Sequence, residues 1–222
     1  MVHRFIRTAS TLLALSAALS VDQWGIAEEA PAYFEDFETL DPGSQPEGFF
    51  AIEGEFSVAD EGGKLLRLPG SPLGSMGAVF GPTIERAVEV RAKVKATRKG
   101  RRYPAFGIGA NGLGGFRLMV NPAKRNLELL LNEESLIQEA YRWNGSEGWT
   151  HLRLVVTEGP ENSSQARAKV WLEDEEEPEA WMIEASSPEA FYASKSSIWG
   201  LPYSGEPIAF DDLFVGPFDA AE

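Results

Sequence analysis

Hydrophobic and polar residues alternate along much of this chain, and the alternation predicts β-strands rather than helices. The clearest stretch is residues 88–96, in which valine or alanine occupies every second position and a charged residue occupies each position between them. A period of two places the apolar side chains on one face of a strand. This stretch therefore predicts an antiparallel strand with one face toward the core and the other toward water.

Shorter apolar segments follow one another at close spacing along the chain. They are residues 54–59, 64–68, 78–80, 105–110, 116–120, 127–131, 136–143, 150–157, 166–172, 181–184, 197–201 and 208–215. Turn sequences such as Gly81-Pro82 and Asn144-Gly145 separate them. About a dozen short strands predict an all-β fold, a two-sheet antiparallel jelly-roll sandwich. We expect little helix beyond one turn over residues 187–194, where Ser-Pro-Glu resembles a helix cap.

Two acidic, aromatic segments lie at opposite ends of the predicted domain. Residues 33–38 read Tyr-Phe-Glu-Asp-Phe-Glu, and residues 208–215 read Ile-Ala-Phe-Asp-Asp-Leu-Phe-Val. We expect these segments to form the first and last strands and to pair side by side. Strict alternation would place Asp211 and Asp212 on opposite faces of the closing strand.

The first residues have the pattern of a secretory signal peptide. Basic residues within the first seven positions precede an apolar run over residues 12–21, which is short for a bilayer span. We expect cleavage after Ser20 or after Ala27, and an N-terminal anchor helix is the alternative. The predicted divisions are a signal peptide (1–27), a short linker (28–32), a jelly-roll domain (33–217) and a tail (218–222). The protein is expected to be secreted or periplasmic, without membrane insertion after the leader is removed.

Composition and charge exclude several classes of function. The formal net charge of −14 disfavours binding to nucleic acids and to anionic membranes, because both present negative charge. The absence of cysteine excludes disulfides, thiolate catalysis and Cys-ligated metal centres. Divalent cations and glycans remain as partners. The basic segment 98–102, Arg-Lys-Gly-Arg-Arg, is expected to be a solvated hairpin tip, with a grip on an anionic partner as the alternative.

Several segments resemble those of a known fold family. The ladder formed by residues 149–156, 168–171 and 179–181 is the most specific, because it matches a pattern of Trp-hydrophobic-Arg, Ala-x-Val-Trp and a final Trp. Residues 34–38, 116–131 and 210–215 resemble the first, central and last strands of the same family. The chain thus resembles a concanavalin A-like (laminin G-like) jelly roll of secreted bacterial proteins. Some relatives are similar to glycoside hydrolase family 16 or to 3-keto-disaccharide hydrolases, and the fold hosts many functions.

The residues do not predict catalysis. Family 16 enzymes place carboxylates with the spacing Glu-x-Asp-x-(x)-Glu on one strand, where they flank the scissile bond. The acidic run at residues 173–177 instead precedes Pro178 and reads as a solvated hairpin loop. His151 is the only histidine beyond the leader, and we expect it to be a surface or structural residue.

Aromatic residues give a better indication of function, because sugar rings stack their C–H faces on aromatic side chains. The candidate carbohydrate-binding residues are Tyr103, Arg117, Tyr141, Arg142, Trp143, Trp199 and Tyr203. Residues 141–144 combine aromatic and polar groups at a strand end, and the others are expected on the concave face or its rim. For Trp143 and Tyr203, core packing and ligand contact are both open. Trp149 and Trp171 are expected in the core.

The terminal carboxylates form a candidate metal site. Ca²⁺ binds six to eight oxygen atoms, which carboxylates and backbone carbonyls supply. The resemblance implies a structural Ca²⁺ between the first and last strands in many carbohydrate modules of this type. The residues in matching positions are Asp36, Glu38, Asp211 and Asp212. The alternative is that these carboxylates accept hydrogen bonds from backbone amides or pair with basic side chains.

We therefore predict an exported carbohydrate-binding or adhesive module without catalysis of its own, whose partner is a glycan or cell-surface polysaccharide. One alternative is a glycan-active enzyme of the glycoside or 3-keto-disaccharide hydrolase type, and another is a structural envelope protein. Two convergent carboxylates in a groove would favour the enzyme. Aromatic and amide groups without such a pair would favour binding, and a groove filled by its own side chains would favour the structural role.

Overall fold

The computed structural model describes residues 33–85 and 87–219. The predicted leader and linker lie outside the described residues. Fifteen strands and one 3₁₀ turn, Pro160–Asn162, make up the regular structure of this part of the chain, and they form two antiparallel sheets. No helix in the same part is long and apolar enough to cross a membrane. The predicted all-β jelly-roll sandwich is confirmed.

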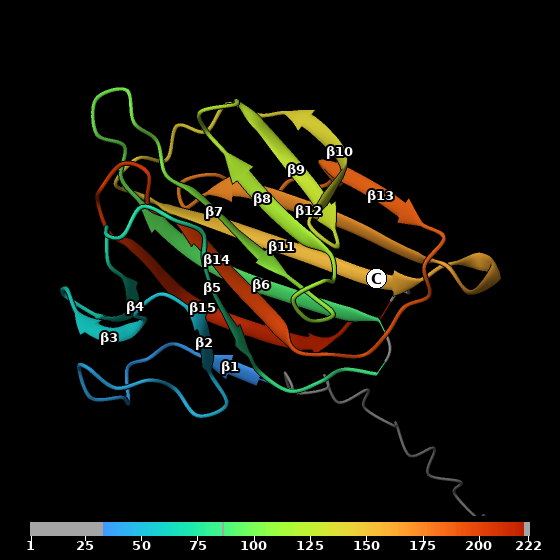
Figure 1. Cartoon of the computed structure of the whole chain (residues 1–222), viewed down its shortest axis with the longest axis horizontal. Coiled ribbons are helices and arrows are strands. Elements are labelled where there is room, and N and C mark those ends of the chain that lie inside the picture. The colour runs from blue at the N-terminus through green and yellow to red at the C-terminus, as the bar shows by residue number, and fades with distance from the viewer. Residues whose placement is uncertain (1–32, 86, 220–222) are drawn as a thin grey trace, which may run out of the picture.

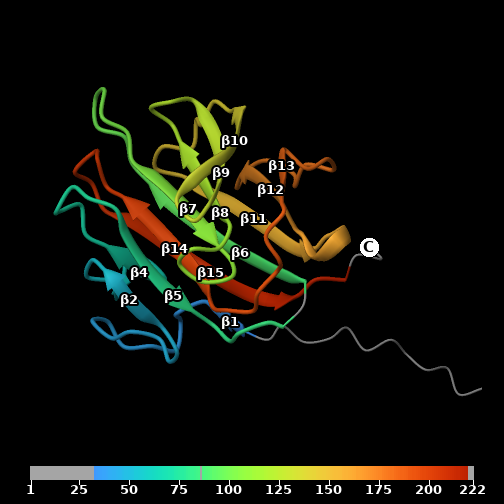
Figure 2. The same ribbon diagram turned by 45° about the vertical axis from the view of Figure 1, so that its right-hand side comes forward.

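The first sheet has eight strands and contains both ends of the domain. Its order is β13 (Ile183–Ser187), β12 (Ser164–Leu172), β11 (Trp149–Glu158), β6 (Val88–Ala96), β15 (Ile208–Pro217), β4 (Lys64–Leu68) and β3 (Ser57–Asp60), with β1 (Tyr33–Glu35) also paired to β15. The seven-stranded sheet has the order β10 (Glu134–Ala140), β9 (Asn126–Leu131), β8 (Arg117–Asn121), β7 (Ala105–Gly109), β14 (Ser196–Leu201), β5 (Met76–Phe80) and β2 (Phe50–Glu53). Figures 1 and 2 show the two sheets stacked face to face.

The core fills the space between the sheets and follows the alternation of the sequence. Val90 and Val94 of β6 and Leu154 of β11 face inward from the eight-stranded sheet, and all three are fully buried. Phe106 and Ile108 of β7 meet them from the other sheet and are also fully buried. Each such side chain contributes roughly 1.5–3 kcal/mol when it leaves water. The wet face predicted for residues 88–96 is the outer face of the eight-stranded sheet.

The closing strand β15 lies between strands from distant parts of the chain. It pairs with β6 along nearly all its length, and on its other side with β4 over residues 208–210 and with β1 over residues 213–215. The predicted pairing of the two terminal strands is therefore confirmed. Because β4 and β1 use successive halves of one edge, β15 joins three strands into a single sheet.

A β-bulge interrupts β15 at its two aspartates. Asp211 pairs with Lys93, whereas Phe214, three residues later, pairs with Arg91, two residues earlier on β6. Asp212 has a φ of 47°, which accommodates the extra residue. Phe210 and Leu213 can then both face the core with no exposure. The expectation that Asp211 and Asp212 occupy opposite faces is wrong, since the bulge resets the alternation and leaves both outside the core.

One local expectation is wrong, and one strand was not predicted. Residues 187–194 form no helix. The side-chain amide of Asn111 donates to the Tyr192 carbonyl at 2.5 Å, and the backbone amide of Gly112 donates to the Lys195 carbonyl at 2.8 Å, so the segment is held extended. The edge strand β2 was not predicted, because all four of its residues are exposed and no alternation marks it.

Phe210→Ala should destabilise the fold severely, because Phe210 is fully buried and packs near Phe56 with ring centroids 6.1 Å apart. We expect a loss of about 3–5 kcal/mol in the free energy of unfolding, measured by urea denaturation. The matched control is Phe214→Ala in the same strand, where the ring lies outside the core beneath Arg91. The control should lose less than half as much, and equal losses would contradict this account of β15.

Candidate functional site

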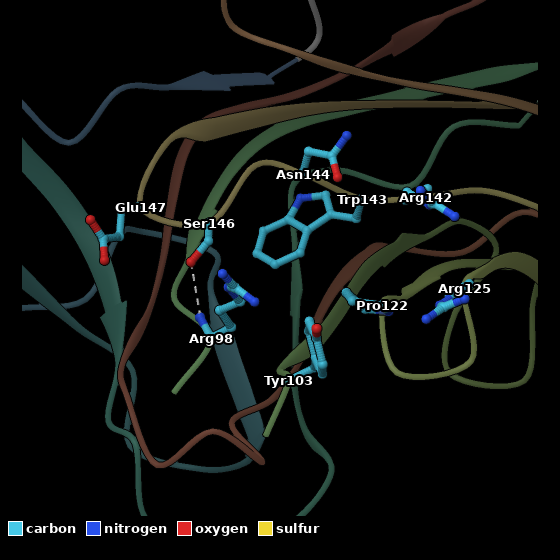
Figure 3. A pocket seen from close by; sticks show the side chains of 9 residues that line it. All are labelled: Arg98, Tyr103, Pro122, Arg125, Arg142, Trp143, Asn144, Ser146 and Glu147. Carbon is cyan, nitrogen blue, oxygen red and sulfur yellow. Dashed lines mark hydrogen bonds between the residues drawn. The ribbon is translucent and has the colours of Figure 1, made fainter. Parts of the chain in front are cut away.

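A pocket of about 590 Å³ opens at one end of the sandwich, where three connections converge. These connections are the β6–β7 loop, the β8–β9 turn and the loop between β10 and β11. The lining residues, drawn in Figure 3, are Arg98, Tyr103, Pro122, Arg125, Arg142, Trp143, Asn144, Ser146 and Glu147. We call this cavity the end pocket.

Trp143 joins the end pocket to the core. Its side chain is only 6% exposed, and its ring meets Phe106 edge-on with centroids 5.6 Å apart. The indole Nε1 donates a hydrogen bond to Thr150 Oγ1 at 3.0 Å. Trp143 is therefore packed in the core and also forms a wall of the pocket, and its contact with a ligand stays a prediction. In Figure 3 its ring lies among the other lining side chains.

The loop after Trp143 is held in place by close packing and by bonds to β6. A side chain at Gly145 would clash, because a β-carbon there would lie 2.8 Å from both Trp143 Nε1 and Thr150 Oγ1. The Glu147 amide donates to the carbonyl of Ala96, the last residue of β6, at 3.1 Å. Ser146 Oγ accepts from the Arg98 amide at 3.1 Å, as the dashed line in Figure 3 marks. These contacts fix the positions from which the lining side chains project.

Positive charge dominates the end pocket. Arg98, Arg125 and Arg142 contribute three exposed guanidinium groups, and Glu147 is the single carboxylate among the described lining residues. Arg125 ends the tight turn after β8 with a φ of 59°, and its carbonyl accepts the Tyr141 amide at 3.0 Å. Guanidinium groups donate several hydrogen bonds each, so the pocket is rich in donors for hydroxyl, carboxylate or sulfate oxygens.

The structure brings together some of the predicted carbohydrate-binding residues and separates the others. Tyr103, Arg142 and Trp143 line the end pocket. Arg117 and Trp199 lie together on the outer face of the seven-stranded sheet, with the Arg117 guanidinium carbon 3.4 Å from the centroid of the indole. The other face of that indole rests against the sheet, where a β-carbon at Gly77 would come within 2.8 Å of it. Trp199 is therefore covered on both sides and only 8% exposed.

Neither of the remaining two candidates lines the end pocket. Tyr141 is half-buried and packs against the core, and burial together with the nearby charge of Glu175 raises the pKa of its hydroxyl to about 12. Tyr203 lies in the turn between β14 and β15 and is 46% exposed. Its hydroxyl and ring are free of the core, but they face solvent outside the cavity.

Sequence reasoning did not select two of the pocket's arginines as binding residues. Arg98 belongs to the basic segment that was expected to be a solvated hairpin tip, and the structure places its side chain in the cavity wall. Arg125 follows the predicted Asn-Pro turn at residues 121–122, but no pattern marked it as a partner of Arg142. The only available signals were the basic segment at residues 98–102 and the Lys-Arg pair at residues 124–125.

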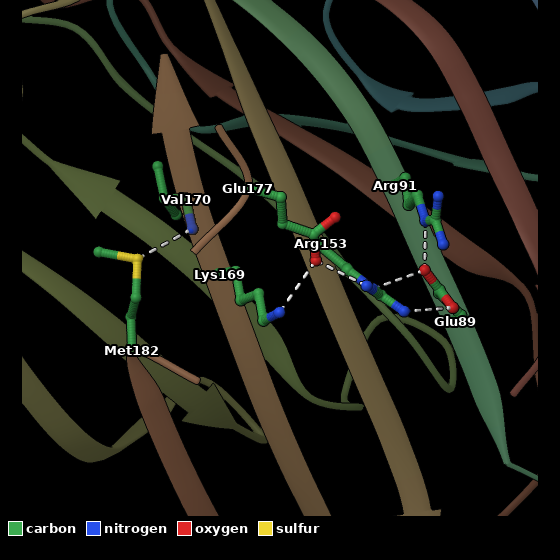
Figure 4. A network of polar contacts seen from close by, with 7 residues as sticks. All are labelled: Glu89, Arg91, Arg153, Lys169, Val170, Glu177 and Met182. Carbon is green, nitrogen blue, oxygen red and sulfur yellow. Dashed lines mark hydrogen bonds and ion pairs between the residues drawn. The ribbon is translucent and has the colours of Figure 1, made fainter. Parts of the chain in front are cut away.

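The acidic run at residues 173–177 lies in the predicted loop between β12 and β13, and residues 173–176 are exposed, but Glu177 is not free in solvent. Figure 4 shows Glu177 folded back onto the outer face of the eight-stranded sheet, where Arg153 Nη1 lies 2.6 Å and Lys169 Nζ 3.0 Å from its Oε1. Partial burial opposes its ionisation, but hydrogen bonds from these two cations hold the pKa of Glu177 below its usual range. Arg153 also pairs with Glu89, 2.8 Å away. These carboxylates serve as ion-pair partners of the sheet.

The ladder tryptophans also lie on this outer face, so the expectation that Trp149 and Trp171 are core residues is wrong. Leu152 and Leu154 of β11 face the core, and alternation therefore turns Trp149 outward. Trp171 stacks on His151 with centroids 5.0 Å apart and an interplanar angle of 9°. His151 Nε2 lies 2.5 Å from Glu173, which makes it a structural histidine in a polar cluster.

The four candidate metal ligands have protein partners. Glu38 accepts the Lys64 amide at 3.0 Å, and Asp36 accepts the Glu38 amide at 3.1 Å. Asp211 accepts the Asp212 amide at 2.8 Å, and Asp212 pairs with Lys93 at 3.0 Å. No group of three or more His, Cys, Asp or Glu residues in the described part of the chain is placed to hold a metal ion. These contacts are those of the hydrogen-bonded alternative.

Comparison with known proteins identifies the fold. No protein-family model matches the chain, and no curated protein matches it in sequence. Among solved structures, the carbohydrate-binding module CBM66 from Bacillus subtilis matches at 13% identity with a TM-score of 0.52, over 76% of this chain and 95% of that one. The fold is a concanavalin A-like jelly roll.

Two further structures share this jelly roll. The alginate lyase Aly36B, solved as a mutant with an alginate trisaccharide, matches at 9% identity with a TM-score of 0.54, over 85% of this chain and 99% of that one. The exoplasmic/lumenal domain of VIP36, in its Ca²⁺/Man3GlcNAc-bound form, matches at 10% identity with a TM-score of 0.55, over 85% and 92%. At such identities the likeness establishes the fold alone, and the resemblance predicted from sequence is confirmed at that level.

Asp211→Asn should stabilise the protein more at neutral than at acidic pH. Burial, with the nearby charges of Asp212 and Asp36, raises the pKa of Asp211 to about 6. At mildly acidic pH the folded chain therefore holds a proton on Asp211 that the unfolded chain does not bind, and this proton stabilises the fold. The stabilisation is lost as the pH rises through about 6. Asparagine keeps the acceptor for the Asp212 amide and removes the charge.

The measurement is a set of thermal melts at about pH 4 and about pH 7.5. It compares the wild type, Asp211→Asn and a control, Asp174→Asn, in the exposed acidic run. We expect the advantage of Asp211→Asn to shrink toward pH 4, while the difference between Asp174→Asn and wild type changes little. An advantage of equal size at both pH values would contradict the raised pKa.

Chelation should leave the melting temperature unchanged, because the carboxylates that follow β1 and those in β15 are engaged by Lys93 and by backbone amides, that of Lys64 included. The measurement is a pair of melts in excess EDTA and in excess CaCl₂. If EDTA lowered the melting temperature by several degrees, and if Asp36→Asn abolished that effect, a calcium ion would join these strands despite the observed pairing.

Proposed function

We propose that this chain is an exported glycan-binding module whose binding site is the end pocket. The observation that carries the proposal is a cavity of about 590 Å³ in which an aromatic wall meets many hydrogen-bond donors. Tyr103 and Trp143 supply the aromatic surface, and Asn144 and the arginines supply polar groups beside it. Sugar rings need this combination, since their C–H faces pack on aromatic rings while their hydroxyls require partners.

The number of carboxylates in the end pocket favours binding without hydrolysis. Hydrolysis of a glycoside generally needs two carboxyl groups on either side of the scissile bond. Among the described residues that line the end pocket, Glu147 alone bears a carboxylate. Glu173 and Glu177 form ion pairs on the outer face of the eight-stranded sheet and are committed to those partners. A glycan-active enzyme and a structural envelope protein remain the alternative functions.

Relatives of the fold support the same class of ligand. CBM66 is a carbohydrate-binding module, and the VIP36 domain was solved with a bound mannose-containing oligosaccharide. Their identity to this chain is too low to transfer a sugar or a site. The proposal of export, to the periplasm or outside the cell, rests on the signal-peptide pattern of residues 1–27.

Retention on a panel of immobilised neutral and acidic polysaccharides tests this function. We expect the full chain to be retained on at least one glycan, and Tyr103→Ala to weaken binding at least about fivefold through loss of aromatic contact. Tyr203→Ala is the matched control, because Tyr203 is exposed and outside the end pocket. Trp143→Ala is unsuitable, since Trp143 also supports the core.

Retention on no glycan would refute the proposed function. Retention that Tyr203→Ala weakens and Tyr103→Ala leaves intact would place binding elsewhere on the surface. Release of reducing ends from a bound polysaccharide during the same experiment would favour the enzyme alternative instead.

A further inference from the structure

Unpaired arginines gather at one end of this acidic protein. Within the described residues, most cations have partners: Lys93 and Arg153 form ion pairs, Arg117 covers Trp199, and Arg167 lies 4.5 Å from the Trp181 ring. Five arginines of the described residues differ, because their guanidinium groups make no ion pair, hydrogen bond or ring contact there. They are Arg98, Arg101, Arg102, Arg125 and Arg142.

All of these unpaired arginines border the end pocket or belong to the loop that forms its wall. Arg98, Arg125 and Arg142 line the cavity, and residues 101 and 102 follow Arg98 in the β6–β7 loop. In a chain with 34 acidic and 20 basic residues, carboxylates are abundant enough to neutralise nearby cations. Among the described residues that line the pocket, Glu147 is the single carboxylate beside three arginines, so the pocket keeps a local excess of positive charge inside a negative surface.

We propose that the end pocket binds an anionic sugar, specifically a uronate residue of an acidic polysaccharide. This inference rests on the proposed glycan-binding function and names its ligand class. A guanidinium group matches a carboxylate in shape and donates two parallel hydrogen bonds to it. Tyr103 and the small exposed part of Trp143 offer apolar surface for a pyranose ring, so charge and ring contacts coincide in one cavity.

The arginines of the end pocket lie in two groups, and this arrangement suits a polymer whose negative groups are separated along the chain. Figure 3 shows Arg98 on one side of the Trp143 ring and Arg125 with Arg142 on the other. A uronate polysaccharide carries one carboxylate per acidic ring, so two rings in succession could meet both groups of arginines. Nucleic acid is a poorer ligand, because its dense phosphates would face the overall charge of −14 beyond the pocket.

The first arm of the test compares ligands. Binding of the full chain to alginate, polygalacturonate and hyaluronan is measured by calorimetry, each beside the same polymer after its carboxylates have been reduced to alcohols. We expect at least one uronate polymer to bind about tenfold more tightly than its reduced form. Raising NaCl from about 0.05 M to about 0.5 M should weaken that binding through screening. Dextran sulfate and dextran distinguish sulfate from carboxylate recognition.

The second arm compares variants. Arg98→Gln and Arg142→Gln should each weaken uronate binding about tenfold or more, because each removes a charge-assisted hydrogen bond. Arg142→Lys keeps the charge but loses the two-pronged geometry, and should fall between wild type and Arg142→Gln. The matched control is Arg67→Gln, which removes an exposed arginine of β4 that pairs with Glu61 at 3.5 Å, and should bind as the wild type does. Melting temperatures establish that every variant is folded.

The outcomes separate this inference from the proposed function. If the pocket bound neutral glycans as tightly as the uronate forms, the assignment of an anionic ligand would be refuted and the proposed glycan binding would stand. Retention on no ligand at all would overturn both. Binding to dextran sulfate but to none of the uronates would refute the assignment to carboxylates. Equal losses in Arg142→Gln and Arg67→Gln would show that general charge, and not the pocket, is responsible.

Discussion

The pairing of β15 with β6, β4 and β1 is the interaction on which the rest of the sandwich depends. It brings the last strand into the middle of the eight-stranded sheet, so the first and last parts of the domain must both be in place before that sheet is complete. The bulge at Asp211 and Asp212 allows Phe210 and Leu213 to face the core together. A regular strand would have exposed one of them, at a cost of roughly 1.5–3 kcal/mol of burial.

The same sheet also determines where the protein's positive charge is available. On its outer face, carboxylates from the strands and from the 173–177 run pair with Lys93, Arg153 and Lys169. Glu89 and Lys169 are buried within this network, whereas the Lys93 pairs are partly exposed, and each pair occupies the cation that forms it. The loops at the end of β6 have no acidic run of that kind beside them, and the arginines of the end pocket therefore keep their hydrogen-bonding capacity for a ligand.

Regular elements were predictable from sequence because their information is local. The alternation over residues 88–96 and the apolar run over 64–68 gave the bounds of β6 and β4 correctly. The strand β2 was missed because no residue in it is buried. The end pocket was found only in part, since Arg98, Arg125 and Arg142 come from three separate connections that only the sheet order brings together. Nor does the sequence show that Arg117 covers Trp199, because that contact depends on the flat, glycine-lined sheet beneath the indole.

Trp143 links the stability of the fold to the readiness of the end pocket. Its ring packs on Phe106 and its Nε1 bonds to Thr150, so one wall of the cavity is as rigid as the core. A ligand that contacts the small exposed part of this ring meets a surface already in place and loses little affinity to ordering the protein. The arginines are different, because their long side chains are exposed and must be ordered when they bind. In the glycan site that we propose, the ring contacts are therefore part of the folded core, whereas the charge contacts depend on how many of the arginines a ligand engages at once.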